Sequence, residues 1–356
     1  MQVIGRTGGL AFASVAGEAR IAVERELVRI LDDEIARSGA DGSSVRAVLG
    51  AVQALTMRGG KRLRPALLAA GFVAAGGDSG ARQVAIAGAA LELLQSYLLI
   101  HDDWMDASAT RRGGPAVHVM LGESFGPSGT AQPPSGAAAI LAGDYASSLS
   151  QRVMLEVPAE PEHVLAAARV LAEVHSEVVR GQVLDMFQDV NTVDEAERLY
   201  ALKTGSYTVA GPLTIGAVLA GGAGLAQPLA AVGRSLGVAF QLQDDLLGLF
   251  GSEAVTGKPV GADLREGKRT WLMTAVMRTE RGRGLVSSAY GQREASPEVI
   301  ERVLSELRGD PATGACRERI ATLCDEARRG VEALPIASQA RELLFGAIAV
   351  LTEREA

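Results

Sequence analysis

The chain has 356 residues, of which 47% are hydrophobic but only 4% aromatic, and its formal net charge is −7. A chain of this length can bury a sizeable core, and its apolar residues are mostly Ala, Leu and Val, of which Ala and Leu favour helices. The acidic balance argues against nonspecific nucleic-acid binding, because that needs a basic surface. It leaves a small anionic substrate open, since a local basic cluster can override the global sign.

Two cysteines, Cys316 and Cys324, are too few for a disulfide framework, and they form no CxxC metal motif. This cysteine usage fits a reducing, cytoplasmic setting. The apolar stretch in residues 1–16 is short and interrupted by Gly, so we expect a flexible leader there. No transmembrane segment is expected in the chain.

Apolar residues recur at helical spacing along most of the chain, and no alternating strand pattern of useful length occurs. In chain order, the predicted helices are 17–38, 43–57, 62–75, 81–106, 139–156, 161–189, 192–204, 207–220, 227–250, 270–279, 297–307, 312–331 and 336–353. Residues 122–138 are rich in Gly, Pro and Ser and are predicted to be a flexible loop. Because no clean linker divides the chain, the sequence predicts an all-α fold in which residues 1–356 form one large helix bundle.

The predicted helix 81–106 ends in an acidic motif, Asp102-Asp103-Trp104-Met105-Asp106. On an α-helix, Asp102 and Asp106 lie about 40° apart around the axis and one turn apart along it. Two carboxylates stacked on one face repel each other unless a cation lies between them, and hard oxygen ligands suit Mg²⁺. Taken alone, this motif is equally compatible with a solvated acidic helix end.

A second acidic pair, Asp244-Asp245, follows the apolar stretch 229–240 in the same way. Two acid pairs at equivalent places on two apolar helices are hard to explain by surface solvation. Facing each other across a bundle, they would form one site for several Mg²⁺ ions. The two motifs together therefore favour a metal site over a solvated surface.

Basic side chains flank the acidic motifs in five groups. These groups are Lys61 with Arg64, Arg111 with Arg112, Lys203, Lys258, and Lys268 with Arg269. Guanidinium groups bind phosphate oxygens in pairs, and the glycines at 59–60 allow a close backbone approach to a ligand. Any one of these cations alone would be an ordinary solvated side chain. Together they suggest two diphosphate sites, one bound through Mg²⁺ and one bound directly.

In combination these motifs resemble the polyprenyl synthetase family, the trans-isoprenyl diphosphate synthases. The motifs are GGKRLRP at 59–65, DDWMD at 102–106, RRGGPAVH at 111–118, AILAGD at 139–144, GQ at 181–182, KT at 203–204, FQLQDD at 240–245, and GKP with DLREGKRT within 257–270. The resemblance covers about residues 45–275. It implies antiparallel helices around a deep central cavity, a homodimer, and Mg²⁺-dependent head-to-tail condensation of isopentenyl diphosphate with dimethylallyl, geranyl or farnesyl diphosphate.

The resemblance also implies a role for each matching residue. The isopentenyl diphosphate pocket would consist of Lys61, Arg64, Gln95 and Arg112. The contacts to the allylic diphosphate would come from Arg111, Lys203, Lys258 and Lys268. Three Mg²⁺ ions would be bound by Asp102, Asp106 and Asp244, with Asp103 and Asp245 in support. The catalytic residues would be Lys203, Thr204 and Gln241, of which Thr204 and Gln241 would face the reacting carbon.

Tyr97 lies five positions before Asp102, and the smaller Leu98 is beside it. In the resembling family an aromatic residue at this place acts as a floor for the growing chain and implies geranylgeranyl diphosphate (C20). Farnesyl diphosphate (C15) is the alternative product, and packing against a neighbouring helix is the alternative role for the ring. The chain departs from the family at Gly248, where many relatives carry a third Asp.

Two other functions share some of these features. A class I terpene cyclase also uses an acidic motif in a helix bundle, but it needs no second diphosphate pocket, so GGKRLRP and Arg111-Arg112 argue against it. A non-catalytic subunit of a heteromeric synthase should have lost acids of the first motif, and this chain retains all three.

Overall fold

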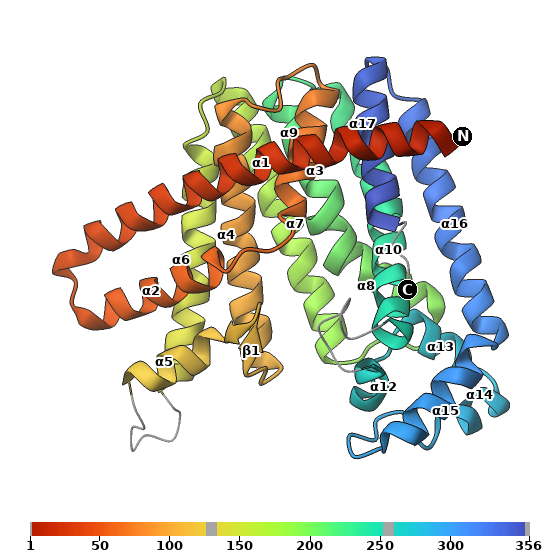
Figure 1. The fold of residues 1–356 in the computed structure, drawn as a ribbon. Coiled ribbons are helices and arrows are strands. Elements are labelled where there is room, and N and C mark those ends of the chain that lie inside the picture. The colour runs from red at the N-terminus through yellow and green to blue at the C-terminus, as the bar shows by residue number, and fades with distance from the viewer. Residues whose placement is uncertain (1, 126–133, 252–259, 353–356) are drawn as a thin grey trace. The chain divides into compact units, whose positions relative to one another are not determined.

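The computed structural model describes residues 2–125, 134–251 and 260–352, and the chain in these ranges is predominantly helical (Figure 1). The strands found there, β1 (Thr110–Arg111) and β2 (Gly114–Pro115), form one small antiparallel hairpin. The all-α prediction is thus confirmed. Contacts between residues group the chain into two compact units: unit 1 contains residues 1–11, 172–211 and 224–356, and unit 2 contains residues 12–171 and 212–223. The single-domain organisation stays a prediction.

Unit 2 carries the first acidic motif at the end of its central helix, α4. Its elements are most of α1 (Gln2–Arg37), η1 (Ser38–Ala40), α2 (Ser43–Met57), α3 (Leu63–Ala74), α4 (Arg82–Met105), the hairpin, α5 (Val117–Phe125), α6 (Pro134–Leu155), the start of α7 (Pro161–Met186) and most of α9 (Gly211–Leu219). Helices α4 and α6 lie side by side and share the most extensive packing in the unit (Figure 1).

Helix α4 is long and apolar enough to cross a membrane by length and composition, which the sequence did not lead us to expect. Its most apolar 18-residue window is 72% buried, and Leu91 and Leu93 are fully enclosed. A helix that is apolar all round is typical of a core position in a large protein as well as of a membrane span. The burial of α4 matches the core position.

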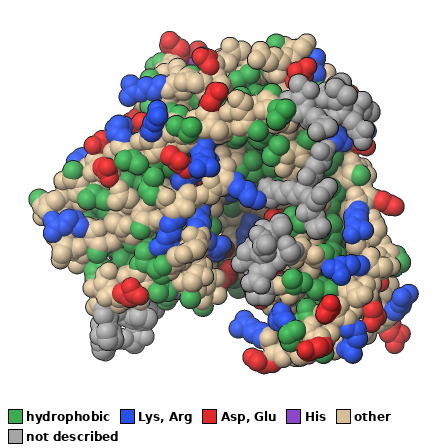
Figure 2. Space-filling model, viewed as in Figure 1, with side chains coloured by type: hydrophobic (Ala, Val, Ile, Leu, Met, Phe, Trp, Pro, Cys, Tyr) green, Lys and Arg blue, Asp and Glu red, His purple; other side chains and the backbone are tan. Residues whose placement is uncertain are grey.

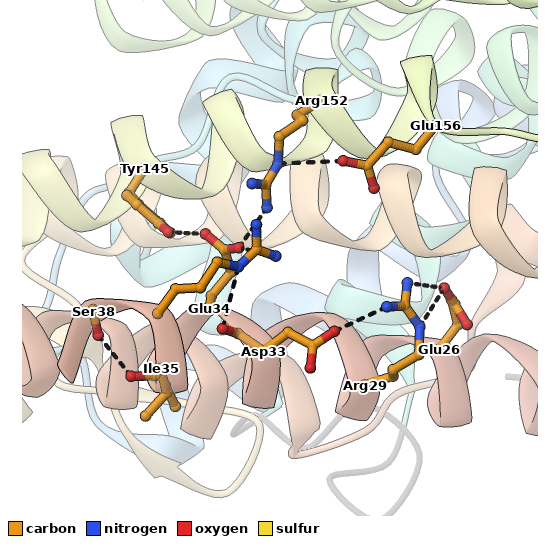
Figure 3. Close-up of polar contacts among 10 residues, drawn as sticks. Glu26, Arg29, Asp33, Glu34, Ile35, Ser38, Tyr145, Arg152 and Glu156 are labelled. Atoms are coloured by element: carbon orange, nitrogen blue, oxygen red, sulfur yellow. Dashed lines mark hydrogen bonds and ion pairs between the residues drawn. The ribbon is translucent and has the colours of Figure 1, made fainter.

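A polar network joins α1 to α6 inside unit 2 (Figure 3). The Glu34 carboxylate accepts hydrogen bonds from the Tyr145 hydroxyl and, at 2.6 Å, from Arg152 Nη2, and it pairs with Arg37 Nη2 at 2.7 Å. Burial favours a raised pKa for Glu34, but the bonds from Tyr145 and Arg152 outweigh it and lower the pKa below its ordinary value. Burial together with Glu34 raises the pKa of Tyr145 to about 12. The network therefore fastens the long α1 helix to the core.

Unit 1 carries the second acidic motif. Its elements are the rest of α7, α8 (Val193–Tyr200), the π-helix η2 (Ala201–Ala210), α10 (Ala226–Phe250), α12 (Ala262–Glu266), α13 (Trp271–Met277), α14 (Glu280–Val286), α15 (Pro297–Arg308), α16 (Pro311–Glu332) and α17 (Ser338–Thr352), with η3 (Ala223–Leu225) at the border of the two units. Helix α10 packs chiefly on η2 and α16. Acidic and basic side chains are interspersed over α14 and α15 (Figure 2), so this surface has no single-sign patch.

The structure corrects two expectations about irregular segments. Residues 2–16 belong to α1, and Phe12 is 1% exposed, so the flexible leader predicted there is wrong for this stretch. The loop predicted at 122–138 is helical at both of its ends, because α5 ends at Phe125 and α6 begins at Pro134. Residues 126–133 lie outside the described residues. Hydrophobic side chains such as Phe12 outweigh the helix-weakening glycines near the start of the chain by packing into the core.

Three short helices, α5, α12 and α14, were not predicted. They contain nine, five and seven residues, which is too short for a 3.6-residue pattern to stand out. The break predicted between 204 and 207 is also wrong, since α8, η2 and α9 follow one another without interruption.

Candidate active site

The first acidic motif ends α4 in helical geometry. The Asp106 N–H donates to the Asp102 carbonyl at 2.9 Å, so the two residues lie one turn apart on one face, as the spacing predicted. Asp102 keeps 26% of its side chain exposed, and Asp106 is exposed. Both carboxylates are therefore accessible to a cation or a ligand from solvent.

Asp103 has a different environment from its two neighbours in the motif. It is fully buried, and its Oδ1 accepts hydrogen bonds from Nε (2.7 Å) and Nη2 of Arg111. Burial raises the pKa of Asp103, and the Arg111 guanidinium opposes that shift. Arg111 Nη2 also lies 3.7 Å from Asp102 Oδ2. The supporting role expected of Asp103 thus takes the form of a direct bond to Arg111, which is itself predicted to bind the allylic diphosphate.

Arg111 and Arg112 lie on the β-hairpin, which the sequence did not predict. The hairpin pairs Thr110 with Pro115 and Arg111 with Gly114. Arg112 and Gly113 form the two-residue turn with φ values of 51° and 72°, as in a type I′ turn, whose positions favour Gly, Asn or Asp. Arg112 is therefore held in a strained backbone conformation at the site, and such strain clusters at functional positions.

The Gly59–Pro65 segment is anchored by Arg62, a residue to which the sequence assigned no role. Arg62 has a left-handed backbone (φ 45°) and a fully buried side chain. Its guanidinium donates to the Glu92 carboxylate and, at 2.8 Å, to the Thr56 carbonyl. Lys61 and Arg64, on either side of Arg62, are exposed and partly exposed. The buried Arg62 thus fixes the backbone on which Lys61 and Arg64 lie, the two residues predicted to bind isopentenyl diphosphate.

Gln95 and Tyr97 lie on α4 before the acidic motif. Gln95 is seven residues from Asp102, which is about two turns and returns to the same face. Its Oε1 is buried and has no hydrogen-bond partner in the described part of the chain, which is compatible with a ligand contact. The Tyr97 ring packs edge-on against His101 with centroids 4.8 Å apart, and His101 Nε2 lies 3.0 Å from the Ile140 carbonyl of α6. Tyr97 is thus buttressed from α6, and Leu98 beside it is half-buried.

In unit 1 a chain of hydrogen bonds joins η2 to α10 and α13. Thr204 Oγ1 donates to Gln241 Oε1 at 2.7 Å, and Gln241 Nε2 donates to Asp245 Oδ1 at 2.9 Å. Asp245 Oδ2 accepts from the Tyr200 hydroxyl, which itself accepts the Trp271 N–H at 2.9 Å. Burial raises the pKa of Asp245 to about 6, although Lys268 opposes the shift. The structure therefore brings the predicted residues Thr204, Gln241 and Asp245 together.

Lys203 lies in the π-helix η2, and its Nζ donates to the Asp185 carboxylate of α7. Helices α7 and η2 approach closely here, because a Cβ on Gly181 would lie 2.7 Å from the Lys203 nitrogen. π-Helical segments are rare and are frequent at functional sites. Asp185 was not predicted as a site residue, and its place three residues after Gln182 of the quoted GQ pair was the available signal.

Lys268 is surrounded by carboxylates. Burial alone would lower the pKa of its ammonium group, but Asp245, Asp263, Asp185 and Asp244 outweigh burial and raise it. One of these acids, Asp185, also accepts a hydrogen bond from Lys203, so acidic and basic side chains alternate beside the second acidic motif. By chemistry the carboxylate oxygens fit Mg²⁺, which completes its coordination with water and phosphate oxygens.

Gly248 is packed against Asp263 of α12. A Cβ on Gly248 would lie 2.6 Å from Asp263 Oδ2. The space beside Gly248 is therefore occupied by a carboxylate from elsewhere in the chain. Position 248, where the chain departs from the family by having Gly in place of Asp, is thus a position with no room for a side chain.

Lys258 and the shared metal site are two predicted features for which the described residues provide no evidence. Lys258 lies outside the described residues. In the ranges 2–125, 134–251 and 260–352, no group of three or more His, Cys, Asp or Glu side chains is arranged to hold a metal ion. A shared metal cluster for the two acidic motifs stays a prediction. A surface pocket of 560 Å³ in unit 2, lined by residues including Phe72, Glu160 and His163, contains none of the predicted site residues.

The chain is similar to known proteins over most of its length. Residues 45–307 match the family model described as polyprenyl synthetase. The chain is 38% identical over 252 residues to a geranylgeranyl diphosphate synthase of Methanosarcina mazei, covering 70% of this chain and 72% of that protein. It is 34% identical over 314 residues to a geranylfarnesyl diphosphate synthase of Aeropyrum pernix, covering 86% and 93%.

A solved structure extends the similarity to nearly the whole chain. It is the geranylgeranyl pyrophosphate synthase of Corynebacterium glutamicum complexed with isoprenyl diphosphate and magnesium, with a TM-score of 0.86 and 31% identity. The match covers 95% of this chain and 99% of that protein. The similarity therefore includes the helices before and after the matched family segment.

Proposed function

Because the chain belongs to the polyprenyl synthetase family and is a polyprenyl diphosphate synthase, a prenyltransferase, we propose that it condenses isopentenyl diphosphate head to tail with an allylic diphosphate in a Mg²⁺-dependent reaction. The proposed product is geranylgeranyl diphosphate. The proposed allylic substrates are dimethylallyl, geranyl and farnesyl diphosphate.

The observation that carries this proposal is the different environment of the three acids that end α4. Asp102 and Asp106 share an accessible face, whereas Asp103 is buried against Arg111. A solvated acidic helix end needs no buried acid that orients an arginine. A diphosphate site does, because a fixed guanidinium binds phosphate oxygens with less loss of side-chain entropy.

Bound Mg²⁺ would neutralise the charge that develops on the departing diphosphate. Asp102 and Asp106 would hold Mg²⁺ in unit 2, and Asp244 would hold it in unit 1. Arg111, Lys203 and Lys268 would bind the allylic diphosphate oxygens, with Arg111 oriented by Asp103 and Lys203 oriented by Asp185. Lys61, Arg64, Gln95 and Arg112 would bind isopentenyl diphosphate, so that its double bond can attack the allylic carbon.

Thr204 and Gln241 would face the reacting carbon with their oxygen dipoles. Their orientation is fixed, because Gln241 accepts from Thr204 through its oxygen and donates to Asp245 through its nitrogen. Such preorganised dipoles stabilise positive charge without reorganising during the reaction. The proton released after carbon–carbon bond formation is proposed to go to the diphosphate.

The product length proposal depends on Tyr97. Its ring is buttressed by His101, which in turn contacts α6, so it can act as a rigid wall beside the acidic motif. The relative from M. mazei is named a geranylgeranyl diphosphate synthase. The ring contact supports a wall at Tyr97, the name of the relative supports C20, and C15 is the alternative that the experiment below distinguishes.

A homodimer is proposed as the assembly. Helix α7 exposes Val179, Val183 and Met186, which are spaced four and three residues apart. An apolar stripe at helical spacing is what a helix buries against another surface. Val183→Glu is expected to convert the dimer to a monomer in light scattering, and a wild-type monomer would contradict the proposal.

The decisive experiment incubates the purified chain with Mg²⁺, labelled isopentenyl diphosphate and each allylic primer in turn, and resolves the products by length. Label in C20 prenyl diphosphate is expected, with none when EDTA replaces Mg²⁺. Hydrocarbon released from an allylic diphosphate alone would instead indicate a cyclase. A chain that forms no product with any primer would support the role of a non-catalytic subunit.

A further inference from the structure

Arg58, the last residue before the Gly59–Pro65 segment, bonds to the β-hairpin more than fifty residues later in the chain. Its Nη1 donates to the Pro115 carbonyl at 2.6 Å and to the Arg111 carbonyl at 3.2 Å. Its Nη2 lies 3.1 Å from Met120 Sδ, at the start of α5. One half-buried guanidinium thus holds both strands of the hairpin and the helix that follows it.

The fit of Arg58 to the hairpin depends on Gly114. A Cβ on Gly114 would lie 2.6 Å from Cζ and 2.8 Å from Nε of Arg58, which is closer than real contacts allow. The guanidinium therefore packs on the bare backbone of Gly114. On the other side, a Cβ on Gly60 would contact the Arg112 guanidinium at 3.5 Å, so Arg112 lies over the Gly59–Pro65 segment.

We infer that Arg58 is a positioning residue that sets the distance between Arg112 of the hairpin and Lys61 and Arg64. This inference rests on the proposed function, in which these three cations bind isopentenyl diphosphate. Arg111 is fixed separately by Asp103, whereas the backbone of Arg112 is strained (φ 51°). Losing Arg58 should therefore disturb Arg112 more than Arg111, and isopentenyl diphosphate more than the allylic partner.

The test measures KM for each substrate in Arg58→Ala, Arg58→Lys, Gly114→Ala and the Arg58→Ala/Gly114→Ala double variant. Arg58→Ala should raise the KM for isopentenyl diphosphate about tenfold, the size of one lost charge-assisted contact, and change the allylic KM less than twofold. Because the two residues act through one contact, the double variant should be no worse than the worse single variant. Guanidinium ion at millimolar concentration should restore binding to Arg58→Ala, and urea at the same concentration should not.

Arg46→Ala and Gly50→Ala are the matched controls. Both residues lie on α2; Arg46 donates to one backbone carbonyl, of Gly39, and a Cβ on Gly50 would meet no atom within 4 Å. An unchanged isopentenyl diphosphate KM in Arg58→Ala would overturn the inference. Equal loss for both substrates without guanidinium rescue would overturn it as well. If Arg58→Ala does not fold, the single variants Arg58→Lys and Gly114→Ala test the inference by the same changes in KM.

Failure of the proposed function has a different signature. In that case the wild-type chain makes no prenyl diphosphate, and calorimetric titration of isopentenyl diphosphate into wild type and Arg58→Ala still tests Arg58. Weaker binding to Arg58→Ala than to wild type would support the inference, and equal binding would overturn it.

Discussion

Asp263 of α12 fills the space beside Gly248 of α10, with its Oδ2 2.6 Å from the point where a Cβ of residue 248 would be. A side chain at 248 and the native position of Asp263 are therefore mutually exclusive. Asp263 is largely buried and contributes to the charge around Lys268. Glycine at 248 thus lets Asp263, the first residue of the DLREGKRT motif, pack against the helix of the second acidic motif.

Asp263→Ala is expected to lower turnover about 10–100-fold, the usual effect of losing a partner of a metal or its ligands. Adding Gly248→Asp to that variant should restore part of the turnover, because a carboxylate returns to the vacated space. Gly248→Asp in the wild-type background should instead lower turnover by displacing Asp263. Steady-state kinetics at saturating Mg²⁺ check all three, and a double variant as slow as Asp263→Ala would show that a carboxylate in this space does not support turnover.

Asp102→Ala and Asp244→Ala are each expected to remove nearly all turnover while the helical fold persists. Removing one of several like charges relieves repulsion, so the variants should unfold no more easily than the wild type. Far-UV circular dichroism with a turnover assay checks both parts. Asp325→Ala, on the exposed face of α16, is the control, and full activity in either site variant would reject the metal role.

Lys61→Ala and Lys203→Ala should affect different substrates. Losing one charge-assisted contact costs about 1.5–3 kcal/mol, so Lys61→Ala should raise the KM for isopentenyl diphosphate by one to two orders of magnitude. Lys203→Ala should slow ionisation of the allylic substrate, and Asp185→Asn should do so more mildly, because Asp185 orients Lys203. If Lys61→Ala changed only the allylic kinetics, the assignment of the two pockets would be reversed.

Tyr97→Ala is expected to shift the products to longer chains without abolishing turnover, because it removes the proposed wall and none of the proposed diphosphate contacts. His101→Ala should cause a smaller shift, since it leaves the ring in place without its buttress. Product distributions from labelled isopentenyl diphosphate give the measurement. An unchanged distribution in Tyr97→Ala would place the floor elsewhere.

The Glu34 network predicts a pH-dependent contribution to stability. Because the folded-state pKa of Glu34 is lowered, the network stabilises the fold above the ordinary Glu pKa of about 4.3, and this stabilisation is lost as the pH falls through the lowered value. Glu34→Gln should therefore lower the free energy of unfolding at pH 7, and the difference from wild type should shrink below about pH 4.

Tyr145→Phe should cost about 1.5–3 kcal/mol at pH 7, because it removes a hydrogen bond to a charged group. Denaturant unfolding at several pH values checks both variants. Arg29→Ala, which breaks only exposed pairs on α1, should cost less than about 1 kcal/mol. A Glu34→Gln difference that stays constant with pH would contradict the role of the carboxylate charge.

The long helices, and the two acidic motifs as candidate site residues, could be predicted from the sequence, because apolar periodicity and charged clusters are local patterns. Asp102 and Asp106 share a face simply by their spacing. Arg62 illustrates what local patterns miss: its partner Glu92 lies 30 residues away, and nothing in GGKRLRP shows which of its cations turns inward. Tyr200, Asp185 and Asp263 escaped notice for the same reason, since each acts through a partner brought near by tertiary packing.

The hairpin was missed because its strands have two residues each, below the length at which alternation can be detected. The π-helix was missed because the predicted helices 192–204 and 207–220 leave out Gly205 and Ser206, which η2 includes. In the folded chain this glycine permits close packing, and a Cβ on Gly237 of α10 would lie 2.3 Å from its Cα. A glycine that interrupts a pattern can thus mark a contact as well as an end.

The strained backbone of Arg112 has a consequence for directed evolution of this enzyme. Glycine at this turn position would relieve the strain of φ 51° and should raise the melting temperature, yet it would delete a cation proposed to bind substrate. A screen that selects heat resistance alone would therefore enrich Arg112→Gly variants that bind substrate poorly. A higher melting temperature and substrate binding require different residues at this position. Libraries that vary the hairpin therefore need selection for activity from the first round.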